Sequence, residues 1–293
     1  MAIEDTVALY TDISHEEANT YALVLTSYGI SYVVRRTANG WELRVADEVR
    51  KEAFSLIEAY REENAAGPGA EKPASMEYPA EKTFTGVWVS LFLLAAHLAR
   101  LSASDPSEIV GRAGAGAEQI LSGELFRTLT ALTLHADFLH LAGNLVGIAL
   151  FGTAVCHLTG AGFGWLMILA SGILGNLANA WLFQSNHLSI GASTAVFGAV
   201  GILGAVQTYR RRRSKTAGFR AWLPLAGGLA LLAFLGAGRH SDITAHLFGF
   251  LAGAVLGSVY ELRLAAPPKK RWQHRFMALA GVVVILSWLA ALS

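Results

Sequence analysis

Long apolar segments are the feature of this chain that most restricts what it can fold into. Between residues 84 and 292, seven segments approach the roughly 20 helical residues needed to cross about 30 Å of hydrocarbon. Charged residues make up only 15% of the chain and hydrophobic residues 53%, which argues against an ordinary soluble enzyme or a disordered chain. The sequence therefore predicts a mainly α, polytopic membrane bundle of seven transmembrane helices. The expected spans are Phe84–Leu101, Leu139–Cys156, Phe163–Phe183, Ile190–Tyr209, Trp222–Gly238, Ile243–Leu262 and Phe276–Leu292.

Charge is distributed unevenly along the chain. Residues 1–82 hold 15 acidic and 8 basic residues, whereas the remainder holds 7 acidic and 15 basic ones. The basic residues occur in short runs between apolar segments and not on one continuous face, so we expect no nucleic-acid partner. The expected partner of the apolar segments is the lipid bilayer. The runs at 210–215 and 263–275 follow the fourth and sixth spans, which makes both loops cytoplasmic by the positive-inside rule.

The first residues lack the basic and apolar regions of a signal peptide. Together with the loop charges, this predicts an integral protein of a bacterial cytoplasmic membrane with its amino terminus in the cytoplasm. From residues 1–64 we predict a small cytoplasmic α/β accessory domain with its elements in the order βαββα. We identify no catalytic constellation in its sequence, and its partner is unknown. Residues 65–82, rich in Pro, Ala, Gly and Glu, are expected to form a linker.

Polar residues inside apolar spans are costly and need a reason. His140 and Asn144 lie four residues apart on one face of the second span, Ser193 begins the fourth, and His246 begins the sixth. These three spans all enter from the outer side, so the residues lie at similar depth. A serine, a histidine that can accept its proton, and further side-chain donors are the groups that acyl transfer needs.

Each of these residues also has an ordinary structural explanation. Ser193 lies in a helix start rich in small residues, where close packing is common, and Asn144 or His246 can supply a hydrogen bond between helices. Separate structural roles explain the set less well than one shared site, because they do not account for why all of these residues lie at a similar depth in the membrane. The pattern of glycines predicts close helix packing; the glycines are Gly198, Gly201, Gly204, Gly249, Gly253 and Gly257.

Taken together, the motifs resemble the rhomboid family of intramembrane serine proteases. The second-span motif is His135-x4-His140-x3-Asn144, the nucleophile motif is Gly191-Ala192-Ser193-Thr194, and the sixth-span motif is Ala245-His246-x2-Gly249-x3-Gly253. Phe126-Arg127 resembles the Trp-Arg that usually ends the family's long first outer loop. The resemblance implies a six-helix catalytic core over residues 84–262. Residues 263–293 then add a basic cytoplasmic loop and a seventh transmembrane helix.

The resemblance implies a Ser193–His246 dyad, with Ser193 as nucleophile and His246 as general base and then general acid. His140, Asn144 and the backbone N–H of Ser193 would form the oxyanion hole. The supporting residues would be Gly191, which allows a tight turn, Phe197, which packs against the catalytic histidine, and His135. No cofactor or metal is expected, and the implied substrates are single-pass transmembrane proteins cut near the outer face of the membrane.

One departure from the family pattern keeps alternatives open. Thr194 replaces the usual glycine after the nucleophile, and a β-branched residue restricts the backbone there. A non-catalytic rhomboid-like protein that binds transmembrane clients is therefore an alternative. Two further alternatives are weaker. One is a metal site on His135, His140 and His246, but the chain lacks a His-Glu-x-x-His helix. The other is a transporter, but the chain lacks paired halves. Asp242 is interpreted as a residue at the span boundary.

Overall fold

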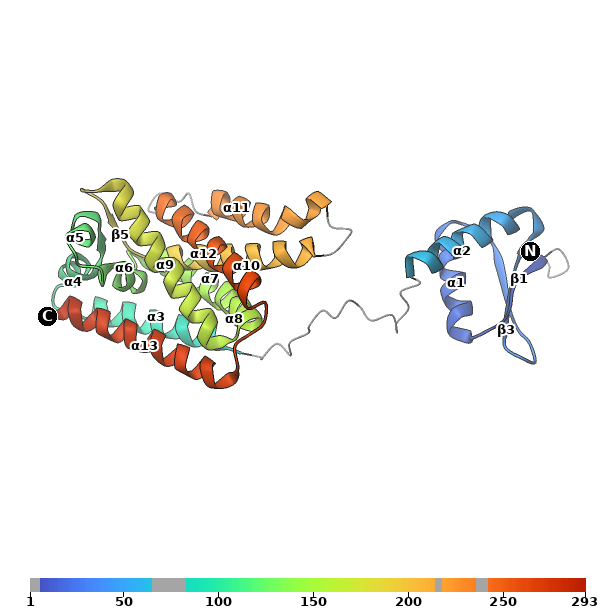
Figure 1. The fold of residues 1–293 in the computed structure, drawn as a ribbon, viewed down its shortest axis with the longest axis horizontal. Coiled ribbons are helices and arrows are strands. Elements are labelled where there is room, and N and C mark those ends of the chain that lie inside the picture. Colours follow the sequence, from blue (N-terminus) through green and yellow to red (C-terminus); the bar gives the residue numbers. More distant parts are fainter. Residues whose placement is uncertain (1–5, 65–82, 214–217, 236–241) are drawn as a thin grey trace. The chain divides into compact units, whose positions relative to one another are not determined.

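A computed structural model describes residues 6–64, 83–213, 218–235 and 242–293 (Figure 1). The chain divides into two compact units, residues 1–77 and 78–293.

The first unit is a three-stranded antiparallel sheet with two helices, in the order βαββα that the sequence predicts. The strand order is β1-β3-β2. Ser14 caps α1 because its hydroxyl accepts the N–H of Glu17 while the Glu17 carboxylate accepts the N–H of Ser14. The core holds fully buried Leu25, Leu43 and Ile57. The elements are β1 (Thr6–Ile13), α1 (His15–Ser27), β2 (Tyr32–Arg36), β3 (Trp41–Ala46) and α2 (Arg50–Asn64).

The second unit is a helical bundle with one two-stranded ribbon formed by β4 and β5. A π-helical turn at Ile148–Gly152 joins α7 to α8, so these two helices form one continuous stretch. The elements are α3 (Thr85–Leu101), α4 (Pro106–Ala113), β4 (Ala115–Gly116), α5 (Ala117–Leu121), α6 (Arg127–Thr130), α7 (Phe138–Gly147), α8 (Thr153–Thr159), α9 (Ala161–Phe183), β5 (Leu188–Ser189), α10 (Ser193–Arg212), α11 (Leu223–Leu235), α12 (Ile243–Arg263) and α13 (Lys270–Leu292).

Several helices have the length and apolarity of membrane spans. Among the described residues, four stretches qualify: Phe138–Thr159, Ala161–Phe183, Ile243–Arg263 and Lys270–Leu292. Thr85–Leu101 and Gly218–Phe234 are shorter apolar stretches, and α10 has 20 residues ending in three arginines. The total of seven spans stays a prediction, and the predicted end of the fifth span at Gly238 lies outside the described residues.

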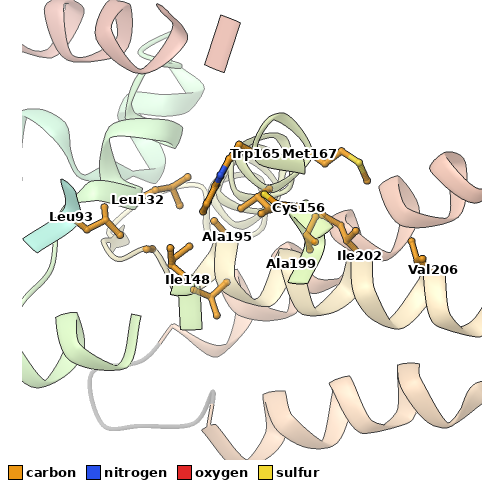
Figure 2. Packing of buried hydrophobic residues seen from close by; sticks show 14 of the residues in the cluster. Leu93, Leu132, Ile148, Cys156, Trp165, Met167, Ala195, Ala199, Ile202 and Val206 are labelled. Carbon is orange, nitrogen blue, oxygen red and sulfur yellow. The ribbon is translucent and has the colours of Figure 1, made fainter. Parts of the chain in front are cut away.

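The bundle core is built from small and branched side chains. Figure 2 shows Trp165 of α9 beside Cys156 of α8, with Ala195, Ala199 and Ile202 following one another along α10. Outward-facing apolar side chains remain exposed, as expected of surfaces that meet lipid. The core therefore joins α9 and α10, the helix that begins at Ser193, to α3, α7, α8 and α12.

The glycines of α12 lie directly against the backbone of α10. A Cβ atom added to Gly249 would collide with the carbonyl oxygen of Thr194, and one added to Gly253 would collide with that of Gly198. A Cβ on Gly257 would lie 2.7 Å from the carbonyl oxygen of Ile202. The predicted packing role of these glycines is confirmed, and only glycine permits this helix spacing.

The long segment 102–134 is folded, not simply a polar surface loop. Arg127 is buried, its Nε donates to Glu124 over 2.6 Å, and its Nη1 donates to the carbonyl oxygen of Gly111 over 2.7 Å. The hydroxyl of Thr130 donates to the carbonyl oxygen of Ala113 over 2.6 Å. Arg127 therefore closes the segment on itself by binding Glu124 and the backbone carbonyls of Gly111 and Gly114.

Candidate active site

Ser193 and His246 meet at the amino-terminal ends of α10 and α12. Nε2 of His246 lies 2.6 Å from Oγ of Ser193, within hydrogen-bond distance. The ring of Phe197, one turn below Ser193 on α10, lies 4.9 Å from the imidazole of His246. His246 is buried and Ser193 is partly exposed. The structure therefore brings together the residues that the sequence predicted as nucleophile, base and aromatic support.

A sharp turn places Ser193 at the start of its helix. Helix α10, which corresponds to the predicted fourth span, begins at Ser193 and not at Ile190. The turn before it requires a φ of +129° at Gly191, which residues with a side chain rarely adopt. Gly191 N–H donates to the carbonyl oxygen of Ala131 over 2.9 Å, which ties the turn to the long segment 102–134. The N–H groups of a first helical turn have no partner within their own helix. Ser193 therefore stands at a helix terminus that favours negative charge.

His140 faces the same turn. A Cβ on Gly191 would lie 2.6 Å from Nε2 of His140 and 3.4 Å from Oγ of Ser193, so the absent side chain leaves space between the two groups. Asn144 is buried on the next turn of α7, where its Nδ2 donates to the carbonyl oxygen of His140 over 3.0 Å. One amide N–H of Asn144 is thus used within its own helix.

His135 supports the nucleophile turn from beneath. The side chain is fully buried, and its Nε2 accepts the N–H of Ala192 over 3.3 Å. Burial, followed by the neighbouring His140 and His97, lowers the pKa of His135 to about 3. The ring is therefore neutral at ordinary pH, which leaves Nε2 free to act as an acceptor.

Thr194 fits its position without displacing the helices. The side chain is buried, and a Cβ placed on Gly175 of α9 would lie 2.6 Å from Cγ2 of Thr194. Gly249 of α12 leaves space on the other side of the same methyl group. Two glycines on neighbouring helices thus accommodate the bulk that replaces the family's glycine.

A polar cluster beside the dyad was missed by the sequence analysis. Asp242 caps α12, as the boundary interpretation requires, since its Oδ1 accepts the N–H of Ala245 over 3.0 Å. Its Oδ2 lies 2.7 Å from Nε2 of His187 and 2.7 Å from Nδ2 of Asn179. Burial raises the pKa of Asp242, but hydrogen bonds from Thr244, Ala245 and His187 outweigh it and lower the pKa to about 2. Only the capping role of Asp242 had a local sequence signal.

The alternative metal site required His135, His140 and His246 to lie together as ligands. In the part of the chain that the structure describes, no group of three His, Cys, Asp or Glu side chains is arranged to hold a metal ion. The rings of His135 and His140 instead meet edge to face with centroids 5.4 Å apart.

Comparison with known proteins agrees with this arrangement. The family profile described as the rhomboid domain matches residues 122–262. Rhomboid-like protease 3 of Toxoplasma gondii is 31% identical over 189 residues, which cover 62% of this chain and 72% of that protein. Rhomboid-like protease 1 of the same organism is 30% identical, covering 59% and 58%. Rhomboid protease GluP of Bacillus subtilis is 30% identical, covering 70% of this chain and 40% of that protein.

The chain belongs to the rhomboid family. It is an integral membrane protein whose relatives are named as proteases.

Proposed function

We propose that this chain is an intramembrane serine endopeptidase that cleaves single-pass transmembrane proteins near the outer face of the membrane. The observation that carries the proposal is the 2.6 Å separation of Nε2 of His246 from Oγ of Ser193. The two helices that bear these residues are packed backbone to backbone, so the pair is held at reacting distance before a substrate binds.

In the proposed reaction, Oγ of Ser193 attacks the scissile carbonyl carbon while Nε2 of His246 takes the hydroxyl proton. The C–N bond then breaks as the imidazolium gives this proton to the leaving amine, and an acyl-enzyme ester remains on Ser193. Water attacks the ester with His246 again accepting a proton. The carboxylate product leaves, and the proton returns to Oγ of Ser193.

We assign the oxyanion hole to His140, Asn144 and the backbone N–H of Ser193. The space between His140 and Ser193, kept open by Gly191, is where an oxyanion would lie. The scissile peptide must leave its helix first, because carbonyl groups within a helix are already hydrogen-bonded. Substrates whose helix unwinds easily near the outer end are therefore favoured.

The proposed architecture follows the charge pattern. Seven helices cross a bacterial cytoplasmic membrane, with the amino terminus inside. Residues 84–262 form the catalytic core, and residues 263–293 add a cytoplasmic basic loop and the seventh span. Residues 1–64 form a cytoplasmic accessory domain, joined by the linker 65–82, for a cytoplasmic partner that is not identified.

Cleavage of a single-pass reporter by purified protein in liposomes tests the proposal. Ser193→Ala and His246→Ala are each expected to abolish cleavage and labelling by a fluorophosphonate probe. Ser258→Ala is the matched serine control, because its hydroxyl donates to the carbonyl oxygen of Ala254 within α12. His274→Ala, on the exposed side of α13, is the histidine control. Both controls should cleave like the native chain.

A folded native chain that neither cleaves nor labels would refute the proposal. That result would favour the non-catalytic alternative, a rhomboid-like protein that binds transmembrane clients. Thr194→Gly would then be the first reversion to examine.

A further inference from the structure

The carboxylate of Asp242 connects two chain segments that arrive at the dyad from the outer side. Oδ1 binds groups of its own helix start, namely Ala245 N–H over 3.0 Å and the hydroxyl of Thr244 over 2.7 Å. Oδ2 binds groups from elsewhere, namely Nε2 of His187 and Nδ2 of Asn179, each over 2.7 Å. One side chain therefore joins the start of α12 to α9 and to the α9–α10 loop.

The donors in this cluster can be assigned from chemistry. An ionised carboxylate only accepts hydrogen bonds, so Nε2 of His187 carries a hydrogen and the amide nitrogen of Asn179 faces Asp242. The amide oxygen of Asn179 then faces the Thr244 hydroxyl, which lies 2.8 Å away. Phe183 stacks on His187 with centroids 3.9 Å apart and an interplanar angle of 10°, which fixes the plane of the imidazole.

His187 is in turn anchored to the segment that delivers the nucleophile. Its carbonyl oxygen accepts the N–H of Ala117 over 2.9 Å, and the next two residues form β5, which pairs with β4. Gly191 and Ser193 follow four and six residues after His187. Movement of His187 would therefore be transmitted along a short, hydrogen-bonded path to the nucleophile.

On the other side, Asp242 is anchored to the base. Its carbonyl oxygen accepts the N–H of His246 over 3.0 Å, so the two residues share the first turn of α12. Below His246, Gly249 fixes α12 against α10 by backbone contact. His246 thus lies between a glycine contact on its inner side and the Asp242 cluster on its outer side.

We propose that His187 is a positioning residue for the cleavage reaction, holding the start of α12, and with it His246, in register with the segment that carries Ser193. Asp242 is the partner through which His187 acts. This role rests on the proposed protease function and adds to it a residue outside the motifs of the dyad and the oxyanion hole.

The experiment measures kcat and KM for reporter cleavage together with the rate of fluorophosphonate labelling and the melting temperature. His187→Ala is expected to lower kcat about 10- to 100-fold with little change in KM, since a misplaced reacting group costs up to about 100-fold. His187→Gln is expected to recover most of the rate, because the Gln amide can donate to Oδ2 of Asp242 as Nε2 does. Ser185→Ala, an exposed residue of the same loop, is the matched control.

A double-mutant cycle links the effect to the pair. Asp242→Asn should lower kcat, and adding His187→Ala to it should cost little more, because residues that act as a unit are not additive. An active native chain whose kcat and labelling rate are unchanged by His187→Ala would overturn this role while leaving the protease function standing. The role would also be overturned if His187→Ala lowered the cleavage rate only as much as it lowered the amount of folded protein, and His187→Gln did not restore the rate. A native chain that neither cleaves nor labels would refute the protease function and this role with it.

Discussion

Helices α12 and α13 are attached to the bundle in different ways. Helix α12 meets α10 through glycines, and its backbone lies against the carbonyl groups of Thr194, Gly198 and Ile202. Helix α13 lies against α4, α6 and α9 (Figure 1), and an open apolar groove of about 390 Å³ remains between it, α6 and α9. The helix that carries the proposed base therefore has its spacing set by backbone contacts at three successive glycines, whereas α13 has a comparable backbone contact at Gln273, against Gly162 of α9, and is otherwise attached by side chains.

Side-chain contacts attach α13 near each of its two ends. Gln273, buried near the first turn, accepts Phe163 N–H over 2.9 Å and donates to the carbonyl oxygens of Thr159 and Pro268. Near the last turn, Trp288 and Ala291 join a small apolar cluster with residues of the segment 102–134 and with Ile190. Between these ends, large apolar residues such as Val282 and Ile285 are 50% and 60% exposed. Substitutions in α12 should therefore disturb the dyad, and most substitutions in α13 should not.

The largest expected effect comes from a single added methyl group in α12. Gly253→Ala would drive a Cβ into the backbone of Gly198, which cannot move aside as a flexible side chain would. Forced overpacking costs about 1–3 kcal/mol, and separation of α10 from α12 would also move His246 away from Ser193. We expect a lower melting temperature and a loss of cleavage greater than the loss of folded protein.

Gly281→Ala in α13 is the matched control, because a Cβ at Gly281 meets no heavy atom within 4 Å. We expect native cleavage and an unchanged or slightly raised melting temperature. Equal loss of activity in the two variants would contradict the contrast between α12 and α13.

The second effect is on stability alone. Gln273→Leu removes three hydrogen bonds and leaves the N–H of Phe163 and the carbonyl oxygen of Thr159 without this partner. An unsatisfied buried group costs about 1–3 kcal/mol. The melting temperature should fall, while kcat per folded molecule stays native because α10 and α12 are undisturbed. His274→Ala, exposed on the same turn, should change neither quantity, and a fall in kcat for Gln273→Leu would show that α13 sets the dyad geometry.

The sequence predicted the features that depend on local pattern. Hydropathy located the long helices, and the spacing of Gly249, Gly253 and Gly257 predicted a closely packed helix face. Residues of similar depth on alternate spans predicted that Ser193 and His246 would meet, because helix direction alternates across a membrane.

Contacts between distant residues had no such signal. The strands β4 and β5 have two residues each, too few for an alternating pattern to be recognised. The extended segment before α10 therefore had no sequence signal, and the predicted fourth span begins three residues before the helix does. His187 lies 55 residues from Asp242, and Gln273 lies 114 residues from Thr159. No periodic pattern in the sequence connects the two members of either pair, because only tertiary packing brings them together.

The third effect depends on pH and concerns the amino-terminal end of α12. The pKa of Asp242 is lowered from 3.8 to about 2 in the folded chain, so ionised Asp242 stabilises the fold above pH 3.8. This contribution is lost as pH falls through about 2, and partial exposure limits it to about 1–2 kcal/mol. Native protein should be more stable than Asp242→Asn at pH 6, by a margin that narrows at pH 3. An equal margin at both pH values in denaturant titrations would argue against an ionised cap.

The smallest effect concerns the carboxyl-terminal end of α13, which contacts the segments that lead to the site. Trp288 packs in one cluster with Leu134 and Ile190, the residues that precede His135 and Gly191. Trp288→Phe keeps an aromatic ring and should cost less than about 1.5 kcal/mol, with cleavage lowered only slightly because backbone hydrogen bonds still hold the turn at Gly191. Leu289→Ala, 59% exposed, is the control that should leave cleavage and stability native. If Trp288→Phe reduced cleavage as much as Gly253→Ala at equal stability, side-chain contacts from α13 would position the nucleophile turn as strongly as backbone contacts position the base.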